Sequence, residues 1–496
     1  MSSAGKSLIA AALCRIFHQD GYSVAPFKSQ NMALNSFVTA DGLEMGRAQV
    51  MQAEAACIEP SVLMNPILLK PTSDIGSQVI VNGEVVGVMS AKDYFVYKKN
   101  LWQPILDAYN TLSSENDIIV IEGAGSPAEI NLKQDDIVNM GLAQKLNAPV
   151  LLVGDIDRGG VFAQLIGTLV LLEEQEKALV KGLVINKFRG DKSILNPGIE
   201  MLEQKSGIPV AGTIPYMKLS LDDEDSLTPR FSNANKEGDR SSLVDIAVIK
   251  LPHISNFSDF TVFDSYQYVC VRYVQNPDDV GMPDLLVIPG SKNTCADLQW
   301  LRHNGFEQII RSVALKTVVI GICGGFQMLG NSLEEDGVVM KGLSLLPVKT
   351  SFLPKKIRTR VTGSVLKVKG ELEALSGLSV EGYEIHTGVT VVDDTSESES
   401  LCPVSQIKDS VSGVEKFDGC YCNNVYGTYI HGFFDNETLC NALVKILAAR
   451  KGIAFHENKL QSFKKRKDEQ YDLLAQTVRS HIDLPYIYSL MDLERK

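Results

Sequence analysis

A single cysteine stands at a sharp glycine-rich turn, Gly321-Ile-Cys323-Gly-Gly325, where a run of Val and Ile gives way to a helical pattern. This is the thiol version of the nucleophile elbow, in which small neighbouring residues let the backbone turn tightly enough to expose the reactive side chain. The amino end of the following helix favours the thiolate, the nucleophilic form of cysteine. The pattern therefore predicts covalent catalysis by Cys323, against the alternative of a buried structural cysteine.

A thiol nucleophile works with a base, and two later histidines are candidates for that role. His386 lies in Gly382-Tyr-Glu-Ile-His-Thr-Gly388, and His431 lies in Gly427-Thr-Tyr-Ile-His-Gly432. The residues alone do not decide which of the two histidines is the base.

A second kind of chemistry is indicated near the amino end, where Gly5-Lys6-Ser7 precedes an apolar helical stretch. In phosphate-binding loops the backbone N–H groups cradle the phosphates, the lysine reaches the β/γ oxygens and the hydroxyl holds magnesium. Gly5, Lys6 and Ser7 therefore predict binding of ATP and Mg²⁺. The complete motif also has an earlier glycine and a preceding strand, so we expect either that this strand is lost or that the loop is supported differently. Weakened ATP binding is expected in the first case.

Three apolar runs end in polar residues: Ile118–Ile121, Val150–Gly154 and Gly182–Ile185. Continuous apolar runs are typical of a parallel sheet covered on both faces, and ligands bind beyond the carboxyl ends of its strands. Glu122, at the end of the first run, is placed to bind magnesium. Asn186 and Lys187, after the third run, are predicted to contact a purine base.

A polar segment, Lys28-Ser29-Gln30-Asn31, follows the first predicted helix. Its amides, hydroxyl and lysine predict binding of an amide-bearing or carboxylated ligand beside the phosphates, and an ordinary strand-to-helix loop is the alternative. Glu44 comes soon afterwards and is predicted as a second carboxylate for magnesium.

The chain is predicted to form two α/β domains, because its 496 residues exceed one ordinary core. Residues 1–218 form a P-loop parallel-sheet domain without its first strand, and residues 244–450 form a second α/β domain around the cysteine elbow. Residues 219–243 have the composition of a linker. Residues 451–496 are expected to be a helical tail that docks on the body, and residues 393–424 are expected to be an extended surface loop.

The composition excludes several classes of protein. A net charge of −12 argues against a nucleic-acid partner, and Lys464–Lys467 is followed directly by acidic residues, as on a solvated helix face. No apolar run approaches the roughly 18 residues of a membrane span. Nine scattered cysteines form no disulfide framework, which predicts a reducing compartment such as the cytoplasm.

Taken together, these residues make the sequence resemble the cobyric acid synthase family over almost its whole length. The motifs that carry the resemblance are Phe27-Lys-Ser-Gln-Asn-Met-Ala-Leu-Asn-Ser36, Glu122-Gly-Ala-Gly-Ser-Pro-Ala-Glu-Ile-Asn-Leu132, Asp155-Ile-Asp-Arg-Gly-Gly160, Ile185-Asn-Lys-Phe-Arg-Gly-Asp191, Ile288-Pro-Gly-Ser-Lys-Asn-Thr294, and the two segments around Cys323 and His431.

The resemblance implies a dethiobiotin-synthetase-like ATPase domain joined to a class I-type glutamine amidotransferase domain. It implies four amidations, at carboxylates b, d, e and g, that convert adenosylcobyrinic acid a,c-diamide to adenosylcobyric acid, with glutamine as nitrogen donor. By match of motif Cys323 is the nucleophile and His431 its base. The N–H groups of Gly324 and of the Gly290 loop are then candidates for stabilising the oxyanion.

One position departs from the wider pattern. Class I amidotransferases commonly carry Glu two residues after the histidine, and this chain has Phe433 there. A Cys-His dyad is therefore plausible, with Glu384 or Asp435 as substitutes that would orient the imidazole.

Three other interpretations stay open. A cobyrinic acid a,c-diamide synthase or related amidoligase shares this domain order, although the Ser29–Ser36 block favours cobyric acid synthase. A partitioning ATPase of the same P-loop branch gives no use to Cys323 or His431. A truncated homologue with a defective ATPase would follow from the loss of the first strand. The oligomeric state is not predicted.

Overall fold

This computed structural model describes residues 3–73, 76–221, 243–393, 402–454 and 463–493, and the statements below concern those residues. The chain divides into two compact units. The first unit contains residues 1–32, 45–221 and 466–496, and the second contains residues 33–44 and 222–465. Most of the predicted linker, residues 222–242, lies outside the described residues.

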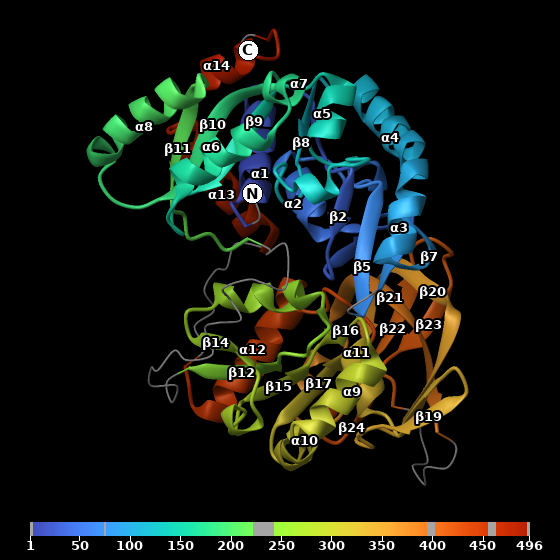
Figure 1. Ribbon diagram of the computed structural model, residues 1–496. Helices are drawn as coiled ribbons and strands as arrows, with labels where there is room; N and C mark the ends of the chain where they lie inside the picture. The colour runs from blue at the N-terminus through green and yellow to red at the C-terminus, as the bar shows by residue number, and fades with distance from the viewer. Residues whose placement is uncertain (1–2, 74–75, 222–242, 394–401, 455–462, 494–496) are drawn as a thin grey trace. The chain divides into compact units, whose positions relative to one another are not determined.

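Parallel strands form the centre of the first unit. β1 (Val24–Phe27) pairs with β8 (Ile118–Ile121), and β9 (Val150–Asp155), β10 (Val180–Phe188) and β11 (Val210–Pro215) form a separate sheet in the order β11-β10-β9. The helix α6 (Val161–Leu171) connects β9 to the parallel strand β10 and packs against β9 (Figure 1). The parallel strands predicted from the apolar runs Val150–Gly154 and Gly182–Ile185 are therefore confirmed.

The remaining elements of the first unit surround these strands. A four-stranded sheet is formed by β2 (Gln30–Met32), β5 (Ile67–Ser73), β6 (Gly76–Val81) and β7 (Glu84–Ser90). The helices are α1 (Lys6–Gln19), α2 (Arg47–Ala55), α3 (Ala91–Tyr97), α4 (Trp102–Glu115), α5 (Met140–Leu146), α7 (Glu174–Lys177), α8 (Lys192–Ser206), α13 (Phe463–Arg479) and α14 (Leu484–Ser489).

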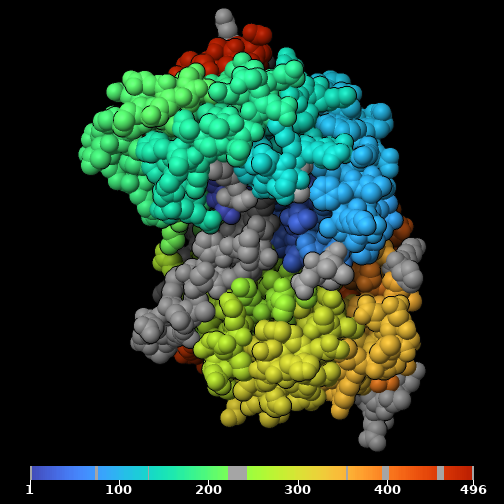
Figure 2. Space-filling view, viewed as in Figure 1, coloured from blue at the N-terminus to red at the C-terminus, as the bar shows by residue number. Residues whose placement is uncertain are grey.

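The helix α1 is largely buried, and little of the dark-blue amino-terminal chain is visible in the space-filling view (Figure 2). The predicted tail helix α13 covers part of it. Tyr471, Leu474, Ala475 and Val478 are buried in one apolar cluster with residues of α1. The tail therefore completes the core of the first unit instead of forming a separate element.

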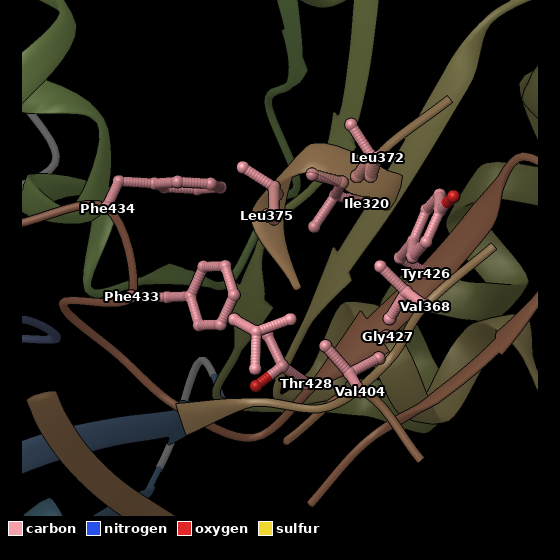
Figure 3. Close-up of a pocket in the computed structure, with 11 residues that line it drawn as sticks. Ile320, Val368, Leu372, Leu375, Val404, Tyr426, Gly427, Thr428, Phe433 and Phe434 are labelled. Carbon is pink, nitrogen blue, oxygen red and sulfur yellow. The ribbon is translucent and has the colours of Figure 1, made fainter. Parts of the chain in front are cut away.

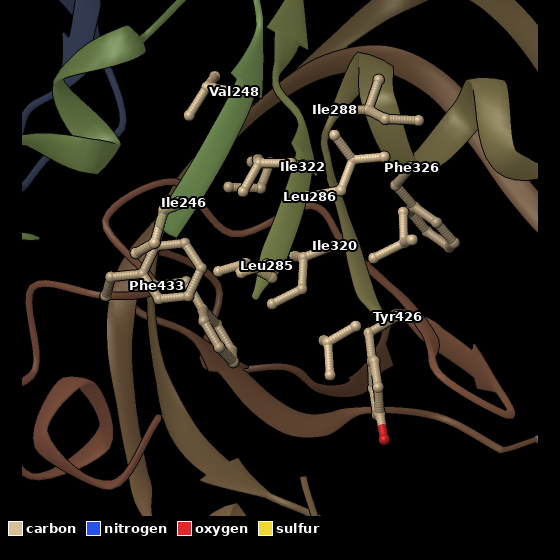
Figure 4. Packing of buried hydrophobic residues seen from close by; sticks show 14 of the residues in the cluster. Ile246, Val248, Leu285, Leu286, Ile288, Ile320, Ile322, Phe326, Tyr426 and Phe433 are labelled. Carbon is tan, nitrogen blue, oxygen red and sulfur yellow. The ribbon is translucent and has the colours of Figure 1, made fainter. Parts of the chain in front are cut away.

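The second unit is built on a six-stranded sheet in the order β14-β12-β15-β17-β25-β24. Its first five strands are parallel and β24 is antiparallel to β25. Val, Ile and Leu from these strands pack into a continuous apolar core (Figure 4), as expected for strands buried on both faces. The strands are β12 (Val244–Ile249), β14 (Val269–Val274), β15 (Leu285–Ile288), β17 (Val318–Ile322), β24 (Cys420–Cys422) and β25 (Val425–Thr428).

A second sheet of this unit has the order β19-β18-β20-β22-β23, with β21 paired to β20. Its strands are β18 (Ser332–Glu335), β19 (Val338–Lys341), β20 (Val348–Val365), β21 (Ser379–Val392), β22 (Ser405–Asp409) and β23 (Glu415–Asp418). The prediction of an extended loop over 393–424 was wrong, because β22, β23 and β24 lie within it. Short alternating runs such as Ser405–Asp409, buried at every second residue, carry too weak a signal to recognise from the sequence.

The other elements of the second unit flank these sheets. Two short strands, β13 (Ile254–Ser255) and β16 (Gly290–Ser291), pair antiparallel, and β3 (Ser36–Val38) contacts β20 and β21. The strand β4 (Glu44–Gly46) spans the division between the units. The helices are α9 (Thr294–His303), α10 (Phe306–Ala314), α11 (Gly324–Leu329) and α12 (Glu437–Lys451). No helix in the described ranges has the length and apolar character of a membrane span.

Candidate active sites

Cys323 lies at the turn between β17 and α11, with φ 52° and ψ −108°. A non-glycine residue at positive φ is strained, and such strain is typical of a nucleophile elbow. The neighbouring glycines are required by packing, because a Cβ on Gly325 would lie 1.9 Å from the carbonyl oxygen of Ile288 in β15. The amide of Cys323 also donates to the carbonyl oxygen of Thr428, at 2.8 Å, which fixes the elbow to β25.

His431 lies three residues beyond β25 and is held by a carboxylate. Its Nδ1 is 2.8 Å from Oδ2 of Asp259, and Oδ1 of Asp259 accepts a hydrogen bond from the Gly432 amide at 2.9 Å. Both side chains are buried. Nδ1–H therefore faces the carboxylate, and Nε2 is the nitrogen left for proton transfer. Nε2 is buried and makes no hydrogen bond to any described residue.

Electrostatics favour the protonated imidazole of His431. Burial lowers the pKa of His431, but the Asp259 carboxylate and the nearby Cys323 side chain raise it further, to about 10. The Cys323 sulfur is thus close enough to His431 to influence its titration. A protonated imidazole next to a cysteine side chain combines a proton donor with a nucleophile.

The carboxylate that orients His431 comes from a residue that the sequence did not suggest. Glu384 is instead bonded to Lys416, 2.5 Å away, and among the described residues the carboxylate bonded to the His431 ring is that of Asp259. Asp259 lies in a short 3₁₀ segment, Phe257–Ser265, whose phenylalanines are buried. An acidic residue inside an apolar stretch was the available signal, because a buried carboxylate requires a partner.

Phe433 explains why the usual glutamate is missing. Its side chain lines a small apolar cavity of about 20 Å³ together with Leu375, Phe434 and Ile320 (Figure 3). A carboxylate in that environment would be desolvated without a partner. The carboxylate bonded to the imidazole is that of Asp259.

The Gly290 loop lies next to both the elbow and the histidine. A Cβ on Gly290 would lie 3.0 Å from Cε1 of His431, and a Cβ on Gly324 would lie 2.8 Å from the Ser291 amide nitrogen. The two predicted oxyanion glycines therefore belong to backbone segments that meet beside Cys323, where N–H donors can stabilise a developing negative charge.

The second candidate base, His386, has different surroundings. Its Nδ1 lies 2.7 Å from the Gly388 carbonyl oxygen, and its ring stacks on Tyr429 with centroids 3.7 Å apart. The side chain is buried, and Nε2 is 3.9 Å from a carboxylate oxygen of Glu384. Of the two histidines, His431 is the one whose carboxylate partner also accepts from a backbone amide and whose pKa is raised by the Cys323 side chain.

In the first unit, polar side chains converge on Glu122 at the end of β8. Its Oε1 accepts hydrogen bonds from Ser7 Oγ at 2.8 Å and from Lys28 Nζ at 3.0 Å, and its Oε2 accepts one from Gln52 Nε2 at 2.6 Å. Lys6 Nζ donates to the Gly125 carbonyl oxygen at 3.2 Å. Residues from four separated segments therefore meet at the amino end of α1, where a helix favours anions.

The residues around Glu122 fit a magnesium ion. Magnesium prefers oxygen ligands and is usually held by one or two protein groups together with water and phosphate oxygens. Ser7 Oγ and Glu122 supply such oxygens side by side. The buried Oε1 of Gln52 makes no hydrogen bond to a described residue, so it is a further available oxygen.

Glu44 does not belong to this cluster. It belongs to the second unit, and its buried carboxylate is bonded to Lys356 Nζ at 2.5 Å. Glu44 and Glu122 thus belong to different units, and the role of Glu44 as a second magnesium carboxylate stays a prediction.

Asn186 and Lys187 hold the start of the chain. Asn186 Nδ2 donates to the Ala4 carbonyl oxygen at 2.8 Å, and Lys187 Nζ donates to the Ser3 carbonyl oxygen at 2.7 Å and to Asp155 at 2.8 Å. Gly5 has φ 85°, and a Cβ there would lie 2.4 Å from Asn186 Nδ2, so glycine is required. The contact of Asn186 and Lys187 with a purine base stays a prediction.

Two family models and many curated proteins match this chain. Residues 1–227 match the "CobQ/CobB/MinD/ParA nucleotide binding domain", and residues 245–439 match the "CobB/CobQ-like glutamine amidotransferase domain". A cobyric acid synthase from Ruminiclostridium cellulolyticum is 54% identical, over 99% of this chain and 96% of the relative. One from Lachnoclostridium phytofermentans is 53% identical over 99% and 98%, and one from Yersinia enterocolitica is 48% identical over 99% and 96%.

The chain belongs to the cobyric acid synthase family. The family predicted from the motifs is thus confirmed, as are the nucleotide-binding and amidotransferase domains. The polar block that favoured this family, Ser29–Ser36, directly follows Lys28, which bonds to Glu122. Ser29 Oγ donates to the Ile137 carbonyl oxygen at 2.7 Å and Asn31 Nδ2 to Gln49 at 3.1 Å, while Gln30 bonds to Tyr94.

Proposed function

We propose that this chain is a cobyric acid synthase that uses ATP and glutamine to amidate carboxylates b, d, e and g of adenosylcobyrinic acid a,c-diamide, giving adenosylcobyric acid. The observation that carries the proposal is that a chain of this family contains two separate sets of reactive residues, one around Cys323 and one around Glu122. One set suits cleavage of an amide and the other suits activation of an acid.

In the proposed glutamine reaction, the Cys323 thiolate attacks the side-chain amide carbon, and the N–H groups of Gly324 and the Gly290 loop stabilise the oxyanion. The imidazolium of His431 gives its proton to the departing nitrogen, which leaves as ammonia. His431 then accepts a proton from water as the water attacks the thioester, which releases glutamate and the thiol. Asp259 keeps Nδ1 protonated throughout, so that Nε2 faces the reacting atoms.

At the other site, a substrate carboxylate attacks the γ-phosphorus of ATP to give an acyl phosphate and ADP. Ammonia then attacks the acyl carbon, and phosphate leaves as the amide forms. Lys6 is placed to stabilise charge on the transferring phosphoryl group, and Ser7 and Glu122 would hold magnesium, which neutralises phosphate charge when bound. Lys28 and its neighbours are proposed to bind the carboxylated substrate.

The thiol chemistry requires a reducing setting, so we propose the cytoplasm as the location of the enzyme. All nine cysteines are free, including Cys323. An oxidised sulfur would lose its nucleophilic character.

The test compares nitrogen sources in the Cys323→Ala variant. We expect loss of glutamine-dependent amidation to about 10⁻⁴ of the original rate or less, because the covalent step is lost, while amidation with ammonium salts persists. Cys295→Ala, a change at a half-buried cysteine outside the site, is the matched control and keeps both activities. Counting the amides in the product by mass spectrometry separates cobyric acid formation from cobyrinic acid a,c-diamide formation. Glutamine-dependent synthesis by Cys323→Ala would contradict the proposal.

A further inference from the structure

Asp297, in the first turn of α9, carries a buried carboxylate that the proposed reaction does not use. Its Oδ2 accepts a hydrogen bond from Ser291 Oγ at 2.6 Å, and its Oδ1 lies 2.7 Å from Nδ1 of His253. The His253 amide nitrogen lies 3.3 Å from each of the two carboxylate oxygens. Because a buried carboxylate is costly without such partners, Asp297 is bound closely to both segments.

The two segments that Asp297 joins build the Gly290 loop beside the cysteine elbow. Ser291 belongs to β16, and His253 directly precedes β13, the strand that pairs with β16. The Ser291 hydroxyl oxygen also accepts a hydrogen bond from the Asn293 amide at 3.0 Å. The direction of this hydroxyl is therefore fixed from two sides, and through it α9 holds the loop.

The backbone amide of Ser291 is directed toward the elbow. The next amide, that of Lys292, donates to the His253 carbonyl oxygen at 2.9 Å and so faces the chain at β13. Since amide directions alternate along a strand, the Ser291 amide faces away from β13. Its nitrogen would lie only 2.8 Å from a Cβ on Gly324, the residue after Cys323. The N–H donor that the loop offers at the elbow is therefore that of Ser291.

The helix α9 is bonded to the other half of the oxyanion site as well. Thr294 Oγ1, at the start of α9, donates to Gln327 Oε1 in α11 at 3.0 Å. Both α9 and β16 contact α11 (Figure 1), and α11 begins at Gly324, whose amide is the second candidate donor. One helix thus fixes the positions of both N–H donors relative to each other.

We propose that Asp297 is a positioning residue for the oxyanion site. By holding the Ser291 hydroxyl, it keeps the Ser291 amide directed at the oxygen that becomes negative when Cys323 attacks glutamine. This charge develops only as the amide carbon becomes tetrahedral, so Asp297 acts on turnover and not on the binding of glutamine. The inference rests on the proposed hydrolysis of glutamine and identifies the residue that sets the geometry of its oxyanion site.

The test measures glutamate release by Ser291→Ala, which removes the hydroxyl and leaves the backbone amide in place. Loss of a whole oxyanion donor costs about 10²- to 10³-fold in kcat, so for a misdirected donor we expect kcat to fall about 10- to 10²-fold, with KM for glutamine within about threefold. Ser351→Ala is the matched control, because it removes a hydroxyl bonded to Glu334 at 3.2 Å in the other sheet of the same unit. It should keep the original kcat, and an unchanged kcat in Ser291→Ala would overturn the proposal.

Alkylation of Cys323 separates the oxyanion site from the elbow as a whole. Iodoacetamide reacts with the thiolate at a saturated carbon and releases iodide, so this reaction forms no oxyanion. The rate of labelling, followed by mass spectrometry of the peptide that contains Cys323, should stay within about twofold in Ser291→Ala. If labelling slowed as much as kcat fell, Ser291 would support the reactivity of the thiol itself, and the proposal would be wrong.

A double variant shows whether Asp297 acts through Ser291. Asp297→Asn keeps one acceptor oxygen and cannot hold both Ser291 and His253, so its kcat should also fall. Because both changes break the same hydrogen bond, the kcat of Ser291→Ala/Asp297→Asn should lie within about threefold of that of the slower single variant. Losses that multiply would overturn the proposal. Failure of the proposed function would appear differently, as absence of glutamine hydrolysis in the unsubstituted protein.

Discussion

The carboxylate of Asp259 is bonded to one imidazole and one backbone amide, whereas the carboxylate of Glu122 receives hydrogen bonds from Ser7, Lys28 and Gln52. The first arrangement leaves His431 Nε2 available beside a thiol, so the protein itself supplies the nucleophile and the proton donor. The second arrangement neutralises a buried carboxylate with donors from the protein, and phosphoryl transfer draws its catalytic charge largely from nucleotide and metal. In the proposed mechanism, covalent chemistry therefore belongs to one unit, and the other unit binds nucleotide and metal.

The largest expected effect that tests this comparison is that of Asp259→Asn. Because an amide at this position no longer stabilises the imidazolium or fixes the Nδ1–H tautomer, we expect glutamine hydrolysis to fall about 10³- to 10⁴-fold, as for carboxylates of catalytic triads. The measurement is glutamate release at saturating glutamine.

Asp435→Asn is the matched control for Asp259→Asn, since the sequence also offered Asp435 as the orienting residue. It should hydrolyse glutamine at nearly the original rate. A larger loss for Asp435→Asn than for Asp259→Asn would show that the carboxylate bonded to His431 in the structure is not the one that matters in catalysis.

The next largest effect is expected for Glu122→Gln, which should impair amidation and leave glutamine hydrolysis intact. We expect amidation to fall about 10²- to 10³-fold with either glutamine or ammonia, because a preorganised charge at the phosphoryl-transfer site is lost. Glutamine hydrolysis should continue, since Cys323 and His431 belong to the second unit. Glu129→Gln, an exposed change in the following loop, is the control. If added ammonia restored amidation by the Glu122→Gln variant, Glu122 would act in the supply of nitrogen and not in phosphoryl transfer.

The sequence predicted those parts of both sites that are marked by local spacing. Glycines on both sides of Cys323 encode a turn whose backbone angles and close packing tolerate little else, and Glu122 follows a short apolar strand directly. Lys28, named from the polar block after the first helix, contacts Glu122 because parallel strands bring their carboxyl ends together.

Partners distant in sequence could not be predicted in this way. Asp259 reaches His431 across 172 positions and lies in an apolar segment with no known motif. Glu44 was assigned to magnesium because it follows Lys28 closely in sequence, but chain proximity does not determine which unit a residue joins. Gln52, which bonds to Glu122 from α2, carries no signal beyond helical composition.

A smaller effect concerns stability as a function of pH. Native His431 has a pKa of about 10, above its ordinary value of 6.5, because of Asp259 and Cys323. The native state therefore binds this proton more tightly, so its contribution to the free energy of unfolding is complete below pH 6.5 and is lost as the pH rises toward 10. In a Cys323→Ala background, which removes the thiol titration, we expect Asp259→Asn to flatten this pH dependence. Urea unfolding at pH 6.5 and 9.5 measures the free energy of unfolding of Cys323→Ala and of the double variant Cys323→Ala/Asp259→Asn. If that free energy changed equally between the two pH values in both proteins, the coupling between Asp259 and His431 would be contradicted.

The smallest expected effect is that of Glu44→Gln on magnesium dependence. Because the carboxylate of Glu44 is bonded to Lys356 in the second unit, its loss should leave the magnesium concentration for half-maximal amidation within about twofold. Ser7→Ala, which removes an oxygen next to Glu122, should raise that concentration at least tenfold, as expected for a direct or supporting ligand. Glu44→Gln also removes the buried ion pair between Glu44 and Lys356, so the thermal midpoint of the second unit should fall. If Glu44→Gln shifted the magnesium dependence as strongly as Ser7→Ala, Glu44 and Ser7 would serve one metal site. Residues of both units would then bind the magnesium ion.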